Sequence, residues 1–197
     1  MTRDEAYKLL TEMMSNQNLI KHGLAVEAIM RVLCKYLKDR SATQGVPLEA
    51  SEFDAEEWAI VGLLHDADYE VIDKNPQRHT LVTEEKLRAL GVSDRIINGI
   101  KAHHSHIKPK RDNLMESAVF AADDMSGLIT ALALVKDRKL ANVTAENILK
   151  KFNEKNFAAG ANREQITSGI KELNLSLEEF AKISLQAMQG ISDELGL

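Results

Sequence analysis

The stretch "LLHDADYE", from Leu63 to Glu70, decides the fold that this sequence predicts. It closes the apolar run "WAIVGLL" with a histidine, three acids and a tyrosine. Apolar helices usually end on Gly, Asn or a basic residue, because the partial negative charge at a helix C-terminus repels carboxylates. Asp66, Asp68 and Glu70 are therefore unfavourable here unless a positive charge lies nearby. A bound metal cation would supply that charge, and its other ligands should then be found elsewhere in the chain.

The sequence on both sides of this stretch has a helical periodicity, and no run alternates with the period of two that a strand requires. Helices are predicted over about 3–14 and 18–40, and the second has an apolar stripe that includes His22. Ser51 and Asp54 can cap a third helix, which ends in the opening stretch. Because "AIVGLL" is apolar on every side, we expect this third helix to be central.

The pattern continues to the end of the chain. A fourth helix is expected from near His79 to Gly91, and Ser93 caps a fifth. Asn113 opens a long sixth helix, "LMESAVFAADDMSGLITALALVKD". Three more amphipathic helices follow from Thr144, one of them with the capping box "SLEE" at 176–179. The sequence therefore predicts an all-α fold in a single domain, residues 1–197.

The composition is that of an ordinary soluble domain, with 44% apolar and 28% charged residues in a chain of 197. A net charge of -5 argues against a nucleic-acid polymer as partner, since binding to a phosphate backbone requires a basic surface. The start "MTRDEAYK" is charged and no run of about eighteen apolar residues occurs, so we expect neither an export signal nor a membrane span. Cys34 is the one cysteine, which fits a reducing cytoplasm.

The histidines are distributed unevenly along the chain. A neutral imidazole is a good ligand for divalent transition metals, and carboxylates add charge and can bridge two ions. Acids also occur inside the apolar stretch "VFAADDMSGLI", where an isolated carboxylate would be costly to bury. Asp123 and Asp124 leave that helix about 100° apart, so one of the two is expected to face solvent. The six histidines are His22, His65, His79, His103, His104 and His106.

Each of these residues also has a purely structural explanation when it is taken alone. A histidine on an apolar face, such as His22, is commonly a core residue bonded to a carbonyl. A pair such as "HH" is a weak signal, and Asp68 and Glu70 can be acids at a solvated helix end. The order of H, HD, H, HH and D on successive helices is what indicates a metal centre.

This order resembles the HD-domain superfamily of metal-dependent phosphohydrolases, which is named for an adjacent His-Asp pair. Here the pair is His65-Asp66 in "GLLHDADYE", and the resemblance extends from His22 to Asp123. The last ligand in the family follows two small residues, as in "AAD", which selects Asp123 over Asp124. Many relatives have "HDIGK" where this chain has "HDADYE", so the lysine that follows the pair is missing. "KKFNEKNFAAGANRE" resembles an extension of small uncharacterised bacterial HD proteins.

The resemblance implies an HD-domain helical bundle with a core of about 18–136 and a C-terminal helical extension of about 142–197. It implies one or two divalent metal ions as cofactors, of Mn, Fe, Ni, Co, Mg or Zn. Extra histidines between the pair and the last acid are typical of the two-metal subgroup, in which Asp66 would bridge. The implied ligands are His22, His65, Asp66 and Asp123 for one ion and Asp66, His79 and His103 for a second, with His104 beside the second ion or against the substrate.

The same comparison suggests roles for nearby charged residues. Asp66 is a ligand, and Asp68 or Glu70 is expected to orient the attacking water or protonate the leaving group. A basic cluster follows the histidine pair, and its members are expected to hold substrate phosphates, although a solvated loop is the alternative. This cluster consists of Lys101, Lys108, Lys110 and Arg111.

These observations predict a cytoplasmic hydrolase of a small phosphate ester, with a nucleotide or related metabolite as the substrate class that the resemblance implies. A branch of the same superfamily uses this ligand order in a di-iron oxygenase, which is one alternative. A non-catalytic metal-binding signalling module is another, and the complete ligand set argues against it.

Overall fold

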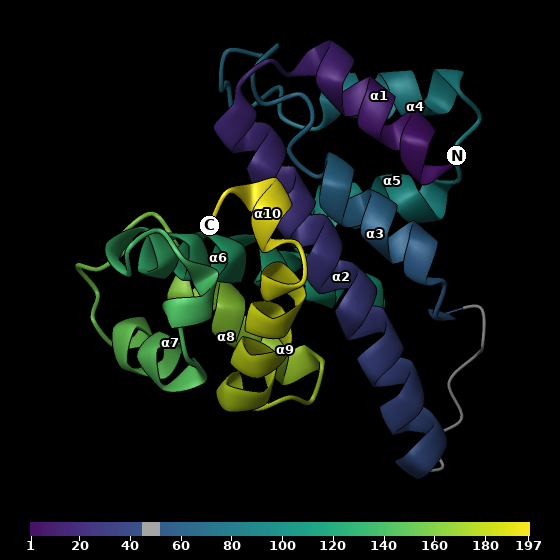
Figure 1. The fold of residues 1–197 in the computed structure, drawn as a ribbon. Helices are drawn as coiled ribbons and strands as arrows, with labels where there is room; N and C mark the ends of the chain where they lie inside the picture. The colour runs from purple at the N-terminus through teal and green to yellow at the C-terminus, as the bar shows by residue number, and fades with distance from the viewer. Residues whose placement is uncertain (45–51) are drawn as a thin grey trace.

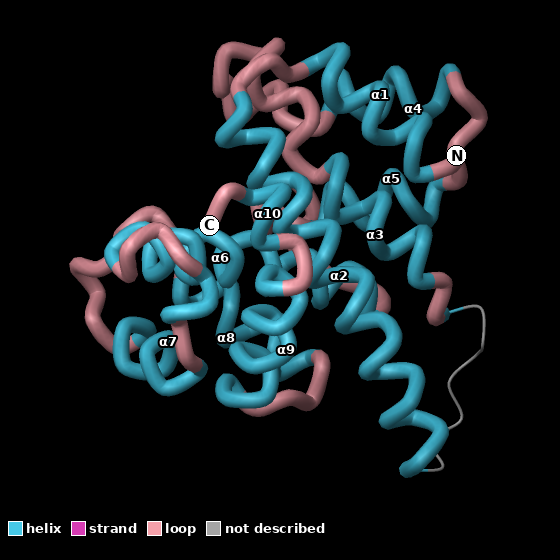
Figure 2. Tube along the Cα trace, viewed as in Figure 1, coloured by secondary structure: helices cyan, strands magenta, loops and turns pink. Residues whose placement is uncertain are grey.

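A computed structural model describes residues 1–44 and 52–197, and this part of the chain contains helices and connecting turns but no strand (Figure 2). The predicted all-α fold class is thus confirmed. The helices, in chain order, are α1 (Arg3–Met13), α2 (Gln17–Gln44), α3 (Ala55–Leu64), α4 (Leu81–Ala89), α5 (Asp94–Ala102), α6 (Leu114–Val135), the 3-10 turn η2 (Leu140–Asn142), α7 (Ala145–Phe152), α8 (Arg163–Glu172), α9 (Leu177–Gln189) and α10 (Ser192–Leu195).

Capping residues predicted from the sequence account for three of the described helix starts. Asp54 accepts hydrogen bonds from two amides of the first turn of α3, and Asn113 accepts one at the start of α6. Ser176 forms the predicted capping box of α9. Ser93 is at the N-cap of α5 but makes no side-chain cap bond. The predicted cap at Ser51 lies outside the described residues.

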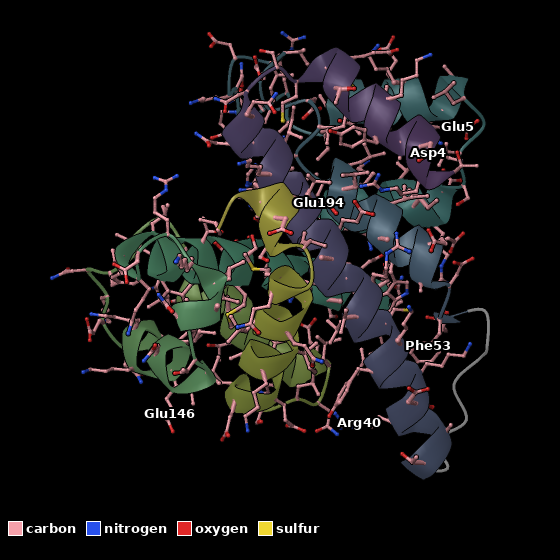
Figure 3. The ribbon with its side chains drawn as sticks, in the orientation of Figure 1. Asp4, Glu5, Arg40, Phe53, Glu146 and Glu194 are labelled. Carbon is pink, nitrogen blue, oxygen red and sulfur yellow. The ribbon has the colours of Figure 1, made fainter. Side chains whose placement is uncertain are left out.

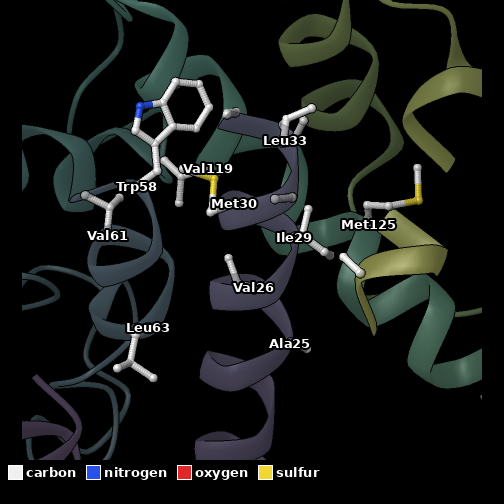
Figure 4. Packing of buried hydrophobic residues seen from close by; sticks show 14 of the residues in the cluster. Ala25, Val26, Ile29, Met30, Leu33, Trp58, Val61, Leu63, Val119 and Met125 are labelled. Atoms are coloured by element: carbon white, nitrogen blue, oxygen red, sulfur yellow. The ribbon is translucent and has the colours of Figure 1, made fainter. Parts of the chain in front are cut away.

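The long helix α2 is the axis of the molecule. In Figure 1, α1, α3, α4 and α5 are drawn to one side of it and α7, α8 and α9 to the other. Figure 4 shows Trp58, Val61 and Leu63 of α3 on one side of α2 and Met125 of α6 on the other. Val61 and Met125 are fully buried, as expected for a core that α2 shares with both neighbours.

Two glycines allow α2 and α3 to approach each other closely. A Cβ atom at Gly62 would lie 2.8 Å from the carbonyl oxygen of Val26, and one at Gly23 would lie 2.9 Å from that of Leu63. Any larger residue would push the two helices apart. This contact brings the end of α3, with His65, against the first turns of α2, with His22.

The C-terminal helices share this core. Helix α8 packs on α6, and α9 packs on α2 and α7. Arg40, near the lower end of α2 in Figure 3, donates a 2.7 Å hydrogen bond to the carbonyl oxygen of Asn174. Charged side chains such as Asp4, Glu5 and Glu146 point outward in the same view. The sequence predicted three helices here, and the short elements η2 and α10 are additional.

Among the described helices, α6 alone is long and apolar enough to cross a membrane by length and composition. The same helix provides much of the protein core, and 61% of its most apolar window is buried inside the molecule. The burial therefore accounts for its hydropathy.

Candidate metal centre

Six side chains from five segments of the chain meet beside the N-terminal half of α2. They come from helices, helix ends and the turns that follow them, so only the tertiary fold brings them together. These residues are His22 in α2, His65 at the C-cap of α3, Asp66 in the next turn, His79 just before α4, His103 at the C-cap of α5 and Asp123 in α6.

The first group consists of His22, His65 and Asp123, whose ligand atoms lie within 4.8 Å of one another. The Nε2 atom of His22 is 3.0 Å from Oδ1 of Asp123, and 3.1 Å from Nε2 of His65. His65 Nε2 lies 3.6 Å from the same Asp123 oxygen. Two imidazole nitrogens and a carboxylate oxygen thus converge on one point, which is the donor set of a divalent transition metal.

The second group consists of Asp66, His79 and His103, again within 4.8 Å. The Nε2 atoms of His79 and His103 lie 2.9 Å apart, and they are 3.1 and 3.5 Å from Oδ1 of Asp66. The other oxygen of Asp66, Oδ2, faces the first group, at 3.6 Å from Nε2 of His65. Asp66 therefore presents one oxygen to each group.

The hydrogen bonds behind the four rings fix which nitrogen faces the centre. His65 Nδ1 lies 2.7 Å from the carbonyl oxygen of Gly62, and His103 Nδ1 lies 2.5 Å from that of Ile100. A carbonyl oxygen only accepts, so Nδ1 carries the hydrogen in both residues. Their Nε2 atoms are thereby free to bind a cation, which is the usual arrangement of histidine ligands.

The other two histidines are held in the same way by side chains. Ser126 donates its hydroxyl hydrogen to the carbonyl oxygen of Asp123 at 2.8 Å, so its oxygen accepts from Nδ1 of His22 at 3.1 Å. His79 Nδ1 donates to Oδ1 of Asp68 at 2.9 Å. All four rings therefore aim Nε2 inward, and the residues present fit a divalent metal.

The charges of the centre compete for protons. Burial disfavours the charged form of His65, but Asp66 and Asp123 outweigh it and raise the pKa of this histidine to about 9. The same balance of burial against hydrogen bonds to Asp66 and Asp68 raises the pKa of His79 to about 9. Burial opposes the ionisation of Asp66, but the surrounding histidines lower its pKa well below the usual range. The centre is thus built to hold positive charge between carboxylates.

Asp68 has a different place from the expected one. Its side chain is fully buried, and besides His79 it accepts hydrogen bonds from the amides of Thr80, Val82 and Thr83 at 3.1 to 3.2 Å. These amides form the start of α4, where a carboxylate is favoured by the helix dipole. Asp68 is therefore committed to holding His79 and α4, and has no free oxygen to handle substrate protons.

Glu70 also makes contacts that the sequence did not predict. It accepts hydrogen bonds from the amides of Ser15 and Asn16 at 3.0 and 2.9 Å, and from the hydroxyl of Ser15. These residues precede the first turn of α2, so Glu70 fastens the turn after α3 to the start of α2. The expected function of Glu70 as an acid beside the metal is not supported by these contacts.

The predicted basic cluster is largely neutralised by acids. Lys101 pairs with Glu84 at 2.7 Å, and Lys108 forms ion pairs with Asp112 and Glu116. Arg111 pairs with Glu172 and lies over the ring of Phe120, 3.9 Å from its centre. Lys110 is almost fully exposed and lies 3.5 Å from Asp112. The four residues thus serve structure or face solvent, which was the alternative to phosphate binding.

His104 lies beside the second group, with its ring centre 5.8 Å from that of His103, whereas Asp124 differs from the expectation. His104 belongs to neither group, and its buried Nδ1 has no hydrogen-bond partner among the described residues. Burial, followed by the neighbouring histidines, lowers the pKa of His104 to about 4. Asp124 does not simply face solvent, because it accepts hydrogen bonds from the amide of Asn162 and the side chain of Gln165. Burial and the nearby Asp123 raise the pKa of Asp124 to about 7.

The fold and the centre together define an all-α protein with a candidate metal site rich in histidine and aspartate. Comparison with protein families gives a match to the HD domain over residues 19–179, from the start of α2 into α9. The chain therefore belongs to the HD-domain family, a superfamily of metal-dependent phosphohydrolases. Neither the curated proteins nor the solved structures contain a match.

Proposed function

We propose that this chain hydrolyses the phosphate ester of a small molecule with two divalent metal ions. The observation that carries the proposal is the orientation of Asp66, with Oδ1 toward His79 and His103 and Oδ2 toward His65. A carboxylate between two histidine groups is suited to join two cations. Bound there, the ions would polarise a phosphoryl oxygen and lower the pKa of a bound water to about 7.

The chain's own residues supply rigidity and charge. Carbonyl oxygens hold His65 and His103, and side chains hold His22 and His79, so that all four Nε2 atoms point at the same space. Such fixed orientation removes the reorganisation that would otherwise accompany the reaction. The buried side of the centre, at His65 and His103, excludes water from behind the metals.

The net charge of -5 supports a small phosphorylated substrate over a nucleic-acid polymer. The resemblance to the HD-domain superfamily makes nucleotides and related metabolites the first substrates to test. The lone cysteine, Cys34, is buried and unpaired, which supports a reducing, cytoplasmic setting.

The test is phosphate release from a panel of phosphorylated metabolites by protein loaded with Mn²⁺, Co²⁺, Ni²⁺ or Mg²⁺, in air and under nitrogen. We expect release in both atmospheres, and an Asp66→Ala variant that loses bound metal and activity together. The matched control is Glu70→Gln, an acid of the same turn that contacts Ser15 instead of the histidines. Activity that depends on oxygen, or full activity of Asp66→Ala, would contradict the proposal.

A further inference from the structure

Two hollows adjoin the metal centre and share His22 and Gly127. One, of about 390 Å³, extends to Lys21, Thr130 and Arg138. The other, of about 310 Å³, extends over Asp123 to the loop around Gly160. We call the two together the α2–α6 cleft, because they lie between these helices and the segments beyond them. The larger hollow is within the usual size of a small-molecule site.

The metal centre is open on the side of this cleft. The side chains of His22 and Asp123 line it and are each 23% exposed. The histidines on the other side, His65 and His103, are 0 and 1% exposed. The centre can therefore be reached from the cleft.

One face of α6 leads away from the centre. Asp123, Gly127, Thr130 and Leu134 follow at intervals of four, three and four residues, so they lie on one side of the helix, and the last three line the larger hollow. The helix rises 1.5 Å per residue, which places Thr130 about 10 Å from Asp123 along the axis. The cleft thus connects the metal-binding carboxylate with a second region at that distance.

Gly127 has no structural reason to be glycine. A Cβ atom there would meet nothing within 4 Å, and its φ is not positive. Glycine in the middle of a helix destabilises the helix relative to alanine, because the unfolded chain has more freedom to lose. The residue therefore costs stability without improving the packing, and what it provides is open space in the cleft beside His22.

Two cations line the larger hollow without an acidic partner among the described residues. Among the described residues, neither Lys21 nor Arg138 forms an ion pair or hydrogen bond through its side chain, in contrast to Lys101, Lys108 and Arg111. Arg138 follows α6 in a turn where both it and Asp137 have φ of 57°. Non-glycine residues rarely adopt this conformation, and such strain is concentrated at functional sites.

We propose that the α2–α6 cleft binds the part of the substrate beyond the phosphate that is hydrolysed, and that Lys21 and Arg138 hold a second anionic group of that part. The proposal rests on the proposed function, because it places the first phosphate at the metals. The substrate class is then an organic molecule with two anionic groups, phosphate or carboxylate, one at the metals and the other in the larger hollow, which reaches Thr130 at about 10 Å along α6 from Asp123.

The test measures binding, so it does not depend on turnover. Hexane bisphosphonate, ethane bisphosphonate and hexyl monophosphonate are titrated calorimetrically into Mn²⁺-loaded protein. Only the first carries two anionic groups at the required separation. We expect it to bind about tenfold more tightly than the other two, the gain that charge-assisted hydrogen bonds from the half-buried Lys21 and the exposed Arg138 provide. A Lys21→Glu, Arg138→Glu double variant should lose this preference and keep its bound metal.

Two further variants make the result specific. Lys139→Glu also replaces a positive charge by a negative one, next to Arg138, but Lys139 is not among the residues that line the cleft. This control variant should keep the preference for hexane bisphosphonate. Gly127→Leu fills the cleft, and should weaken the binding of hexyl monophosphonate and hexane bisphosphonate alike at unchanged metal content. Equal affinities of the wild type for the three probes, or a preference that survives in the double variant, would overturn the cleft assignment. If no metabolite of the panel releases phosphate, the proposed function is contradicted. The calorimetric preference for hexane bisphosphonate is a separate result and does not depend on that outcome.

Discussion

Replacement of Asp68 by asparagine should weaken the second metal group and spare the first, although Asp68 is not a ligand in our assignment. Asp68 Oδ1 accepts from Nδ1 of His79 at 2.9 Å and from the amide of Thr80 at 3.1 Å, while Oδ2 accepts from Val82 and Thr83. Asparagine keeps one oxygen and places an NH₂ group where the other was. Either Nδ1 of His79 and the amide of Thr80, or the amides of Val82 and Thr83, then face this NH₂ group instead of an acceptor.

The size of the effect follows from these contacts. Removal of the group that orients a histidine ligand typically lowers metal affinity about 10–100-fold, or about 1.4–2.7 kcal/mol. Donors left without an acceptor at the start of α4 would cost a further 1–3 kcal/mol or so of folding stability. The first group does not contact Asp68, since its rings are held by Gly62 and Ser126. We therefore expect the loss of one ion per chain at limiting metal.

The assay is a Mn²⁺ titration of metal-free Asp68→Asn, followed by calorimetry and by metal analysis after desalting. Glu70→Gln serves as the control, because this residue makes similar hydrogen bonds two positions on but contacts Ser15 and Asn16. Two unchanged binding steps in a folded Asp68→Asn protein would refute the reasoning. Equal weakening of both steps would also refute it, since the two groups would then not be held independently.

Three further predictions concern the centre and its support. A His79→Ala, His103→Ala double variant should retain one ion and lose the other, and an unchanged metal count after identical loading would exclude the second site. Because the pKa values of His65 and His79 are about 9 in the metal-free protein and about 6.5 in the unfolded chain, metal-free stability should fall as the pH rises from 6.5 to 9. Mn²⁺ affinity should rise over the same interval, since metal displaces those protons. Thermal unfolding with and without Mn²⁺ measures both effects. A difference in Tm between the two forms that narrows as the pH rises would contradict the assignment of His65 and His79 as ligands. Gly62→Ala should cost about 1–3 kcal/mol of stability in urea unfolding and weaken the first group, because its Cβ would lie 2.8 Å from the Val26 carbonyl oxygen; retention of full stability would show that the helices can separate freely.

The sequence by itself determined the helices and the ligand types. Hydrophobic periodicity and caps such as Asp54, Asn113 and Ser176 are local signals, because a helix end is satisfied by residues within one turn. The order of histidines and acids then indicated the centre, and the structure brings His22, His65, Asp66, His79, His103 and Asp123 together as two groups. The cost of burying an isolated carboxylate drew attention to the acids, and the resemblance to the HD-domain superfamily supplied the ligand set.

Only the tertiary structure decided what each charge compensates. The three acids of the opening stretch have separate partners: Asp66 faces the histidines, Asp68 the start of α4 and Glu70 the residues before α2. The partners of Glu70 lie more than fifty positions away in sequence, and no local pattern encodes such a contact. The same limit applies to the cations. Lys108 and Arg111 form a basic run in the sequence, but the fold places Glu116 and Glu172 against them. Lys21 and Arg138 beside the cleft have no ion pair with any residue that the structure describes, because electrostatic partners are set by distance in space.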